Sequence, residues 1–138
     1  MCFILYGAVN KDIDPTEYTA ISDRSCFSFR AGTKHELKMC IMKNTDDYRI
    51  TDWICDCDFP FASHDPQALE LTELESLILA IKNIKNSKFI YISKTWQGTR
   101  NKTEQTVDLS EIDLPRFFAD AKVNCLYQIN LHDKEGRS

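Results

Sequence analysis

The sequence predicts a single α+β domain in which a mixed β-sheet carries about three helices. Residues 2–9 and 88–93 are apolar runs of strand length, typical of strands that are buried on both faces. Residues 71–84 carry apolar side chains at helical spacing. Residues 34–57 form two strand-like segments around a polar cluster, which is typical of a hairpin. Strands joined by both hairpins and helical crossovers indicate a mixed sheet, although the pattern does not give the strand order.

The first half of the chain is expected to combine short strands with one short helix. Asp14 can accept N–H groups of a first helical turn, and Pro15 and Glu17 suit the positions that follow, so a helix is predicted from there to about residue 24. The other expected elements are a strand at 26–29, a turn at 31–32, a strand at 36–42, a turn at 44–47 and a strand at 48–57.

The second half is expected to hold the longest helix and the strands that complete the sheet. A helix is predicted from Pro66 or Leu71 to Ile84. Its apolar stripe consists of Leu71, Leu74, Leu77, Ile78, Ile81 and Ile84. The other expected elements are a strand at 88–93, a polar loop at 94–104, a short strand at 106–109, a helix at 114–121 capped by Asp113 and a strand at 123–131. The domain spans residues 1–138, and its tail at 132–138 is expected to fray.

The composition is that of an ordinary globular protein and excludes several classes. With 17 basic and 21 acidic residues the net charge is −4, so a general affinity for nucleic acid or an anionic membrane is not expected. No apolar run approaches the roughly 18 residues of a membrane span, and the first residues lack the basic segment of a signal peptide. We therefore expect a cytoplasmic protein, in which six cysteines are buried thiols, metal ligands or redox groups rather than a disulfide framework.

The run Cys-Asp-Cys-Asp at 55–58 is the feature that could carry chemistry. It lies where a predicted strand ends and shortly before a helix begins, a position that sites in open sheets favour. On an ideal strand, the Cα atoms of Cys55 and Cys57 lie roughly 6.7 Å apart, so the thiols can share a metal or a disulfide only if the strand bends. The expected hairpin register places residue 35 or 36 opposite Cys55, and residue 35 is His35; His64 follows in the next loop. These four residues are a candidate metal or thiol site, and zinc suits such ligands.

A second candidate is the predicted loop at 94–102, which could hold an anionic ligand or a nucleotide. Trp96 could stack on the ligand, and Arg100 and Lys102 could pair with a phosphate group. The spacing of a phosphate-binding P-loop is absent. The alternative interpretation is a solvated connection with Trp96 packed against the domain.

Three functional hypotheses follow from these features. The leading one is a small binding module with a thiol or zinc-like metal site at His35, Cys55, Cys57 and His64. The second is a thiol-dependent enzyme that uses Cys55 or Cys57 as its nucleophile. The third is a regulatory or interaction domain whose cysteines are structural and whose 94–102 loop meets a partner. An exposed edge of the hairpin would also be compatible with a homodimer.

Overall fold

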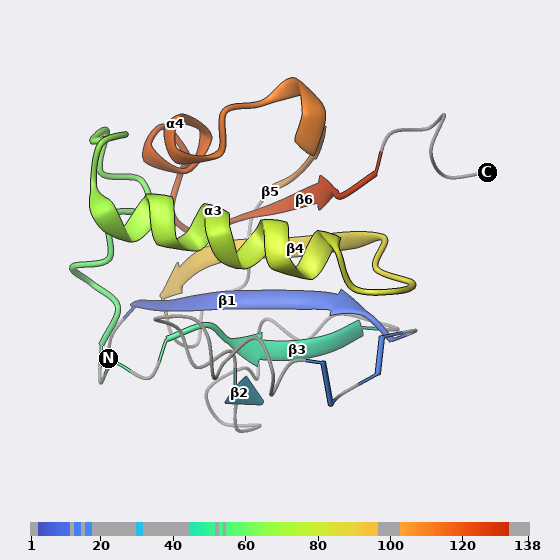
Figure 1. Cartoon of the computed structure of the whole chain (residues 1–138). Helices are drawn as coiled ribbons and strands as arrows, with labels where there is room; N and C mark the ends of the chain where they lie inside the picture. The colour runs from blue at the N-terminus through green and yellow to red at the C-terminus, as the bar shows by residue number, and fades with distance from the viewer. Residues whose placement is uncertain are drawn as a thin grey trace.

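The fold is built on a mixed β-sheet, shown in Figure 1 as a computed structural model. The structure describes residues 3–11, 13–14, 16–17, 30–31, 45–51, 53, 55–96 and 103–132, with the backbone alone at 30–31 and 103–104. In this part of the chain six strands have the order β2-β3-β1-β4-β6-β5. The strands are β1 (Phe3–Asn10), β2 (Arg30–Ala31), β3 (Thr45–Arg49), β4 (Phe89–Trp96), β5 (Thr103–Asp108) and β6 (Cys125–Asn130). Neighbouring strands are antiparallel, except that β5 and β6 are parallel.

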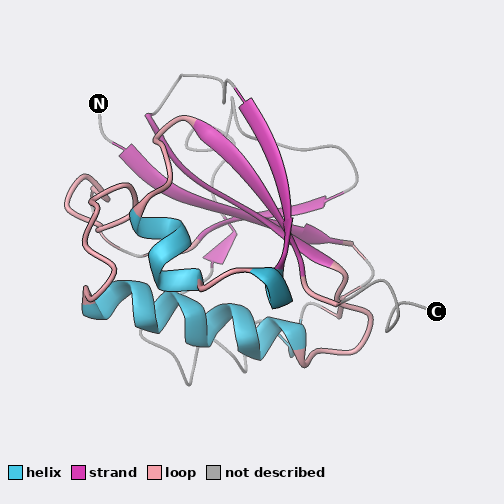
Figure 2. Cartoon of the chain, turned by 90° about the horizontal axis from the view of Figure 1, so that it is seen from above, coloured by secondary structure: helices cyan, strands magenta, loops and turns pink. Residues whose placement is uncertain are grey.

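Two α-helices pack side by side on one face of this sheet, α3 (Leu69–Lys82) and α4 (Leu114–Ala119) (Figures 1 and 2). Alternate residues of each strand point to opposite faces of a sheet. In β1, Leu5 and Val9 therefore join the core beneath the helices, whereas Ile4, Tyr6 and Ala8 join a second cluster on the other face. The prediction of a central strand covered on both faces is confirmed for β1, which lies between β3 and β4.

Helix α3 confirms the predicted apolar stripe. Leu71, Leu74, Leu77, Ile78, Ile81 and Ile84 are all buried in the helix-side core. The helix begins between the two predicted starting points and ends at Lys82, a cation that interacts favourably with the helix dipole. On the opposite side of the helix, Leu79 is exposed. The fold class predicted from this helix and the buried strands, an α+β domain with a mixed sheet, is confirmed.

The parallel pair at the far edge is a β–α–β unit. From β5 the chain passes through a 3-10 turn (Leu109–Glu111) and α4 before it returns as β6, as a parallel connection requires. Asp113 occupies the predicted N-cap position, but its backbone carbonyl rather than its side chain accepts a hydrogen bond, from the N–H of Phe117 at 2.8 Å. Strand β6 is shorter than predicted, and Val123 is exposed instead of lying on the buried face.

The predicted hairpin at 34–57 is wrong in the part that the structure describes. The expected turn at 44–47 largely belongs to β3, which ends at Arg49 rather than at Cys57. Ala31, expected in a turn, lies in β2 and pairs with Tyr48. The physical reason is pairing with β1, which extends along all of β3 from Tyr6↔Arg49 to Asn10↔Thr45 and outweighs the local turn preference of the polar residues. The strands predicted at 26–29 and 36–42 lie outside the described residues.

Strand β4 also differs from its prediction, because it continues to Trp96. Lys94, Thr95 and Trp96 were expected in a loop, but they pair with the first residues of β1, ending at Phe3↔Trp96. The described residues contain two α-helices rather than about three. Of the helix predicted at 14–24, Thr16 and Glu17 are described and are helical, and Asp14 accepts the N–H of Thr16 at 3.0 Å, as a cap should. No helix in the described ranges combines the length and apolar character needed to cross a membrane.

Candidate functional site

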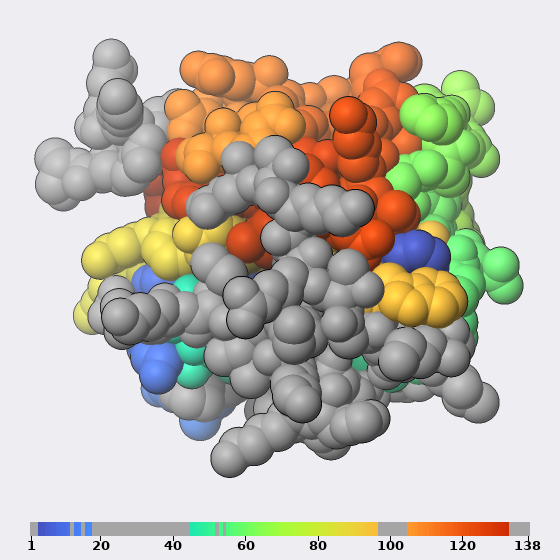
Figure 3. All heavy atoms as spheres, turned by 180° about the vertical axis from the view of Figure 1, so that it is seen from behind, coloured from blue at the N-terminus to red at the C-terminus, as the bar shows by residue number. Residues whose placement is uncertain are grey.

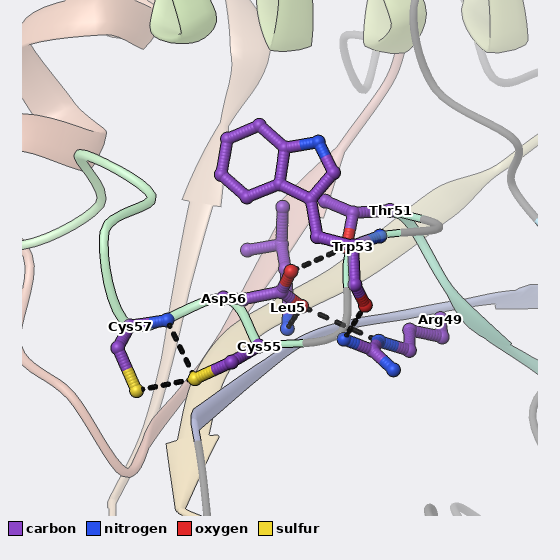
Figure 4. Close-up of polar contacts among 7 residues, drawn as sticks. All are labelled: Leu5, Arg49, Thr51, Trp53, Cys55, Asp56 and Cys57. Atoms are coloured by element: carbon purple, nitrogen blue, oxygen red, sulfur yellow. Dashed lines mark hydrogen bonds and ion pairs between the residues drawn. The ribbon is translucent and has the colours of Figure 1, made fainter.

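The cysteine pair lies on a loop that is fixed to the sheet where β1 begins. After β3, the N–H of Ile50 donates to the carbonyl oxygen of Leu5 at 3.0 Å. A few residues later the N–H of Asp56 donates to the carbonyl oxygen of Phe3, also at 3.0 Å. The backbone of the loop is thus bound to β1 at two points. Asp56, which makes the second of these contacts, lies between the two cysteines (Figure 4).

The buried side chain of Asp56 holds this loop in place. Its carboxylate is fully buried and accepts the N–H of Leu5 at 2.6 Å and the Arg49 Nε–H at 3.4 Å. The hydroxyl group of Thr51 donates to the other carboxylate oxygen. Arg49 is itself buried and also donates to the carbonyl oxygen of Trp53. A buried carboxylate is tolerable only when it is paired in this way, so these contacts fix the conformation of the loop.

The two thiols on either side of Asp56 face each other. In Figure 4 their sulfur atoms lie together, on the side of the backbone away from the Asp56 carboxylate. The Sγ atoms of Cys55 and Cys57 are 2.6 Å apart, and the N–H of Cys57 donates to the Cys55 Sγ at 3.4 Å. Both cysteines are free thiols, Cys55 half-buried and Cys57 exposed. The bend that the sequence required is present, because these residues form a loop and turn instead of a strand.

Lys94 is a member of this site that the sequence analysis missed. Its side chain is almost fully buried, and its Nζ donates to the carbonyl oxygens of Cys57 and Phe59, each at 2.8 Å. Burial lowers the pKa of Lys94, although negative charge on Cys57 and on the neighbouring acidic groups acts in the opposite direction. A usable signal was present, because Ile90 and Ile92 alternate toward the helix-side core and residue 94 continues that face.

The other predicted site residues do not join the cysteines. His64 is largely exposed, and its Nδ1 lies 3.5 Å from an Asp120 carboxylate oxygen at the end of α4. The backbone N–H of His64 donates to the carbonyl oxygen of Ala119 at 2.8 Å. Within the described ranges, no three His, Cys, Asp or Glu side chains are grouped so that they could hold a metal ion. His35 lies outside the described residues.

The predicted ligand loop is described only at its start. Trp96 ends β4, is about one-third exposed, and packs edge-on against Phe3 with 5.0 Å between the ring centroids. Arg100 and Lys102 lie outside the described residues, so the anion site predicted there stays a prediction.

The described geometry therefore assembles two neighbouring thiols, a buried carboxylate that fixes their loop and a buried ammonium group. Two adjacent thiols can exchange with a disulfide, because one can attack it and the other can complete the exchange. Comparison with known proteins adds no assignment: no family model matches the chain, and neither a curated protein nor a solved structure matches it.

Proposed function

We propose that the protein is a thiol–disulfide redox protein in which Cys55 and Cys57 alternate between a dithiol and an intramolecular disulfide. The observation that carries this proposal is the 2.6 Å separation of their Sγ atoms. This separation is shorter than the van der Waals contact of two sulfur atoms, so the two side chains are already directed at each other within reach of a disulfide bond of about 2.05 Å. The proposal develops the second sequence hypothesis, a thiol-dependent enzyme, and uses the same two cysteines.

The surroundings of the pair favour redox chemistry over the zinc-like site of the leading sequence hypothesis. A structural zinc needs two further ligands besides the two thiolates. The described part of the chain offers no third ligand beside the pair, since His64 lies against Asp120.

The two thiols have different surroundings, and this assigns them different roles in the proposal. Cys57 is exposed and is the thiol that attacks a disulfide in solution. Cys55 is half-buried, and its sulfur accepts the N–H of Cys57, so we assign it the second attack. The Lys94 ammonium group, held on the carbonyl of Cys57, supplies positive charge to the same loop.

We propose that this redox cycle takes place in the cytoplasm, which is the location expected from the sequence. Cytosolic thiol systems keep most protein cysteines reduced, so a pair that cycles must be re-reduced there after each oxidation. We therefore expect the dithiol to be the resting form and the disulfide to be transient.

The direct test is a redox titration in glutathione buffers, followed by mapping of the disulfide by mass spectrometry. One two-electron transition that joins Cys55 to Cys57 is the expected result. Cys57→Ser should abolish it, and Cys125→Ala, which removes a buried thiol in the core, is the matched control. The proposal is overturned if both thiols stay reduced in oxidising buffer. Near-stoichiometric zinc that is lost in Cys55→Ser/Cys57→Ser would support the metal-site hypothesis instead.

A further inference from the structure

Three exposed apolar side chains among the described residues lie on segments that contact the cysteine loop or Lys94. In the described part of the chain, five large apolar side chains are exposed: Trp53, Leu69, Leu79, Trp96 and Val123. Two of these are on α3. The other three belong to segments that contact the cysteine loop or Lys94, and we call Trp53, Trp96 and Val123 the apolar rim.

Hydrogen bonds and ring contacts connect each member of the rim to the site. Trp53 lies two residues before Cys55, and its ring is 5.6 Å from that of Phe59, whose carbonyl oxygen holds Lys94. In Figure 4 the indole ring of Trp53 lies on the side of the loop that carries the Asp56 carboxylate, and the two sulfur atoms lie on the other side. Trp96 lies two residues after Lys94 in β4, and its ring packs against the ring of Phe3. The carbonyl oxygen of Phe3 in turn accepts the N–H of Asp56.

Val123 is connected through its neighbour Asn124. The N–H of Asn124 donates to the carbonyl oxygen of Lys94, and its side-chain oxygen accepts the N–H of Trp96, each at 2.8 Å. The end of β4 and the start of β1 reach the surface side by side in Figure 3, in gold and dark blue. The rim is therefore built from three separate segments that meet at one end of the sheet.

We propose that the reaction partner of the dithiol is a polypeptide that carries an exposed disulfide, and that the apolar rim binds the chain on either side of that disulfide. This inference rests on the proposed function. Tryptophan is enriched where proteins bind other proteins, because its large ring buries apolar area at a small cost in conformational entropy. Apolar groups spread over three segments suit an extended chain with apolar side chains.

A small anionic disulfide such as oxidised glutathione is less well matched to this surface. Its carboxylates would need cations, and in the described part of the chain the buried cation of the site, Lys94, is directed at the carbonyl oxygens of Cys57 and Phe59, while Lys122 lies beside Val123. The rim itself offers two indole rings and a valine side chain. The partner is thus recognised by its apolar residues, and the dithiol supplies the chemistry.

The reaction balances as a two-step exchange. The Cys57 thiolate attacks one sulfur of the partner's disulfide, which forms a mixed disulfide and releases the other partner sulfur as a thiolate. The Cys55 thiolate then attacks the Cys57 sulfur, which forms the Cys55–Cys57 disulfide and releases the first partner sulfur. The partner gains two electrons and two protons, and the two cysteines of this protein lose them.

The test compares two disulfides and three variants of the full chain. The reduced protein is mixed with a synthetic peptide whose disulfide is flanked by apolar residues, or with oxidised glutathione, and the rate of disulfide formation is measured by acid quench and mass spectrometry. Trp53→Ala and Trp96→Ala are made singly, so that a folding defect in one leaves the other to decide. Leu79→Ala, an exposed leucine on α3, is the control.

We expect each tryptophan variant to lower the rate with the peptide about tenfold, as for an interface hot spot, and to change the rate with glutathione less than about twofold. Leu79→Ala should change neither rate. Equal losses with both disulfides, or no loss with the peptide, overturn the inference while the proposed redox function stands. A wild-type dithiol that reacts with neither disulfide removes the proposed function, and this inference with it.

Discussion

Replacing Asp56 by asparagine should destabilise the protein more than any other single change in the cysteine loop. Asp56 is fully buried, and its carboxylate carries the negative charge that pairs with Arg49, itself about 5% exposed. Removing one member of a buried ion pair typically costs about 3–5 kcal/mol, because the other charge stays buried without compensation. Asparagine keeps the shape and one acceptor oxygen for the N–H of Leu5, so we expect the lower end, about 3 kcal/mol.

The assay is urea unfolding followed by circular dichroism. With a slope of about 2 kcal/mol per molar urea, a loss of about 3 kcal/mol lowers the midpoint by roughly 1.5 M. Asp58→Asn is the matched control, because Asp58 is exposed in the same loop and its replacement should change the free energy of unfolding by less than about 0.5 kcal/mol. Equal midpoints for Asp56→Asn and the wild type would refute the claim that the buried carboxylate holds the loop.

Three further predictions concern the core, Lys94 and Tyr127. Leu77→Ala should cost about 2–5 kcal/mol in urea unfolding because it leaves a cavity beneath α3, whereas Leu79→Ala, on the exposed side of the same helix, should cost less than about 0.5 kcal/mol. Burial lowers the pKa of Lys94 in the folded state, so the folded protein loses this proton at a lower pH than the unfolded chain does. The free energy of unfolding should therefore increase with pH between the two pKa values. Lys94→Met should reduce that increase in urea titrations at a series of alkaline pH values. Burial raises the pKa of Tyr127 to about 12, so an ultraviolet titration of the native protein should show one late-titrating tyrosine that is missing in Tyr127→Phe.

The elements that could be predicted from the sequence are those whose local pattern agrees with their environment. The stripe from Leu71 to Ile81 has a helical period and is buried along one side of α3, and Ile84, just after the helix ends, is buried in the same core. Strand β1 is apolar on both faces and lies in the middle of the sheet. In both cases the side chains that the sequence pattern assigns to a buried face are buried in the structure, so the local pattern and the tertiary packing agree.

The elements that were mispredicted owe their structure to pairing with a distant strand. Thr45, Asp46 and Asp47 favour a turn by composition, but they form β3 because they pair with the second half of β1. Hydrogen bonds between side chains accompany that pairing, since the Tyr6 hydroxyl group donates to the Asp47 carboxylate at 2.9 Å. Such contacts join residues about forty positions apart, and a local pattern does not contain them.

The candidate site was predicted only in part, because some of its residues are placed by pairing between distant strands. The sequence indicates the two cysteines and the need for a bend, because their spacing is visible in the chain. Lys94 was assigned to a loop, because the extension of β4 depends on its pairing with the first residues of β1. His64 was grouped with the cysteines on proximity in the sequence, whereas its backbone N–H and its ring both contact the end of α4.

The place of Asp56 between the two cysteines bears on what their oxidation can change. Its backbone N–H is held by Phe3 and its carboxylate by Leu5, Arg49 and Thr51, so the backbone of the loop is fixed independently of the sulfur atoms. The two sulfur atoms already face each other, so closing the disulfide requires a movement of the side chains and not of the backbone. Oxidation is therefore expected to leave the sheet and the rim in place. A dithiol that changes state without changing the fold suits electron transfer to a bound partner better than a switch that works by unfolding.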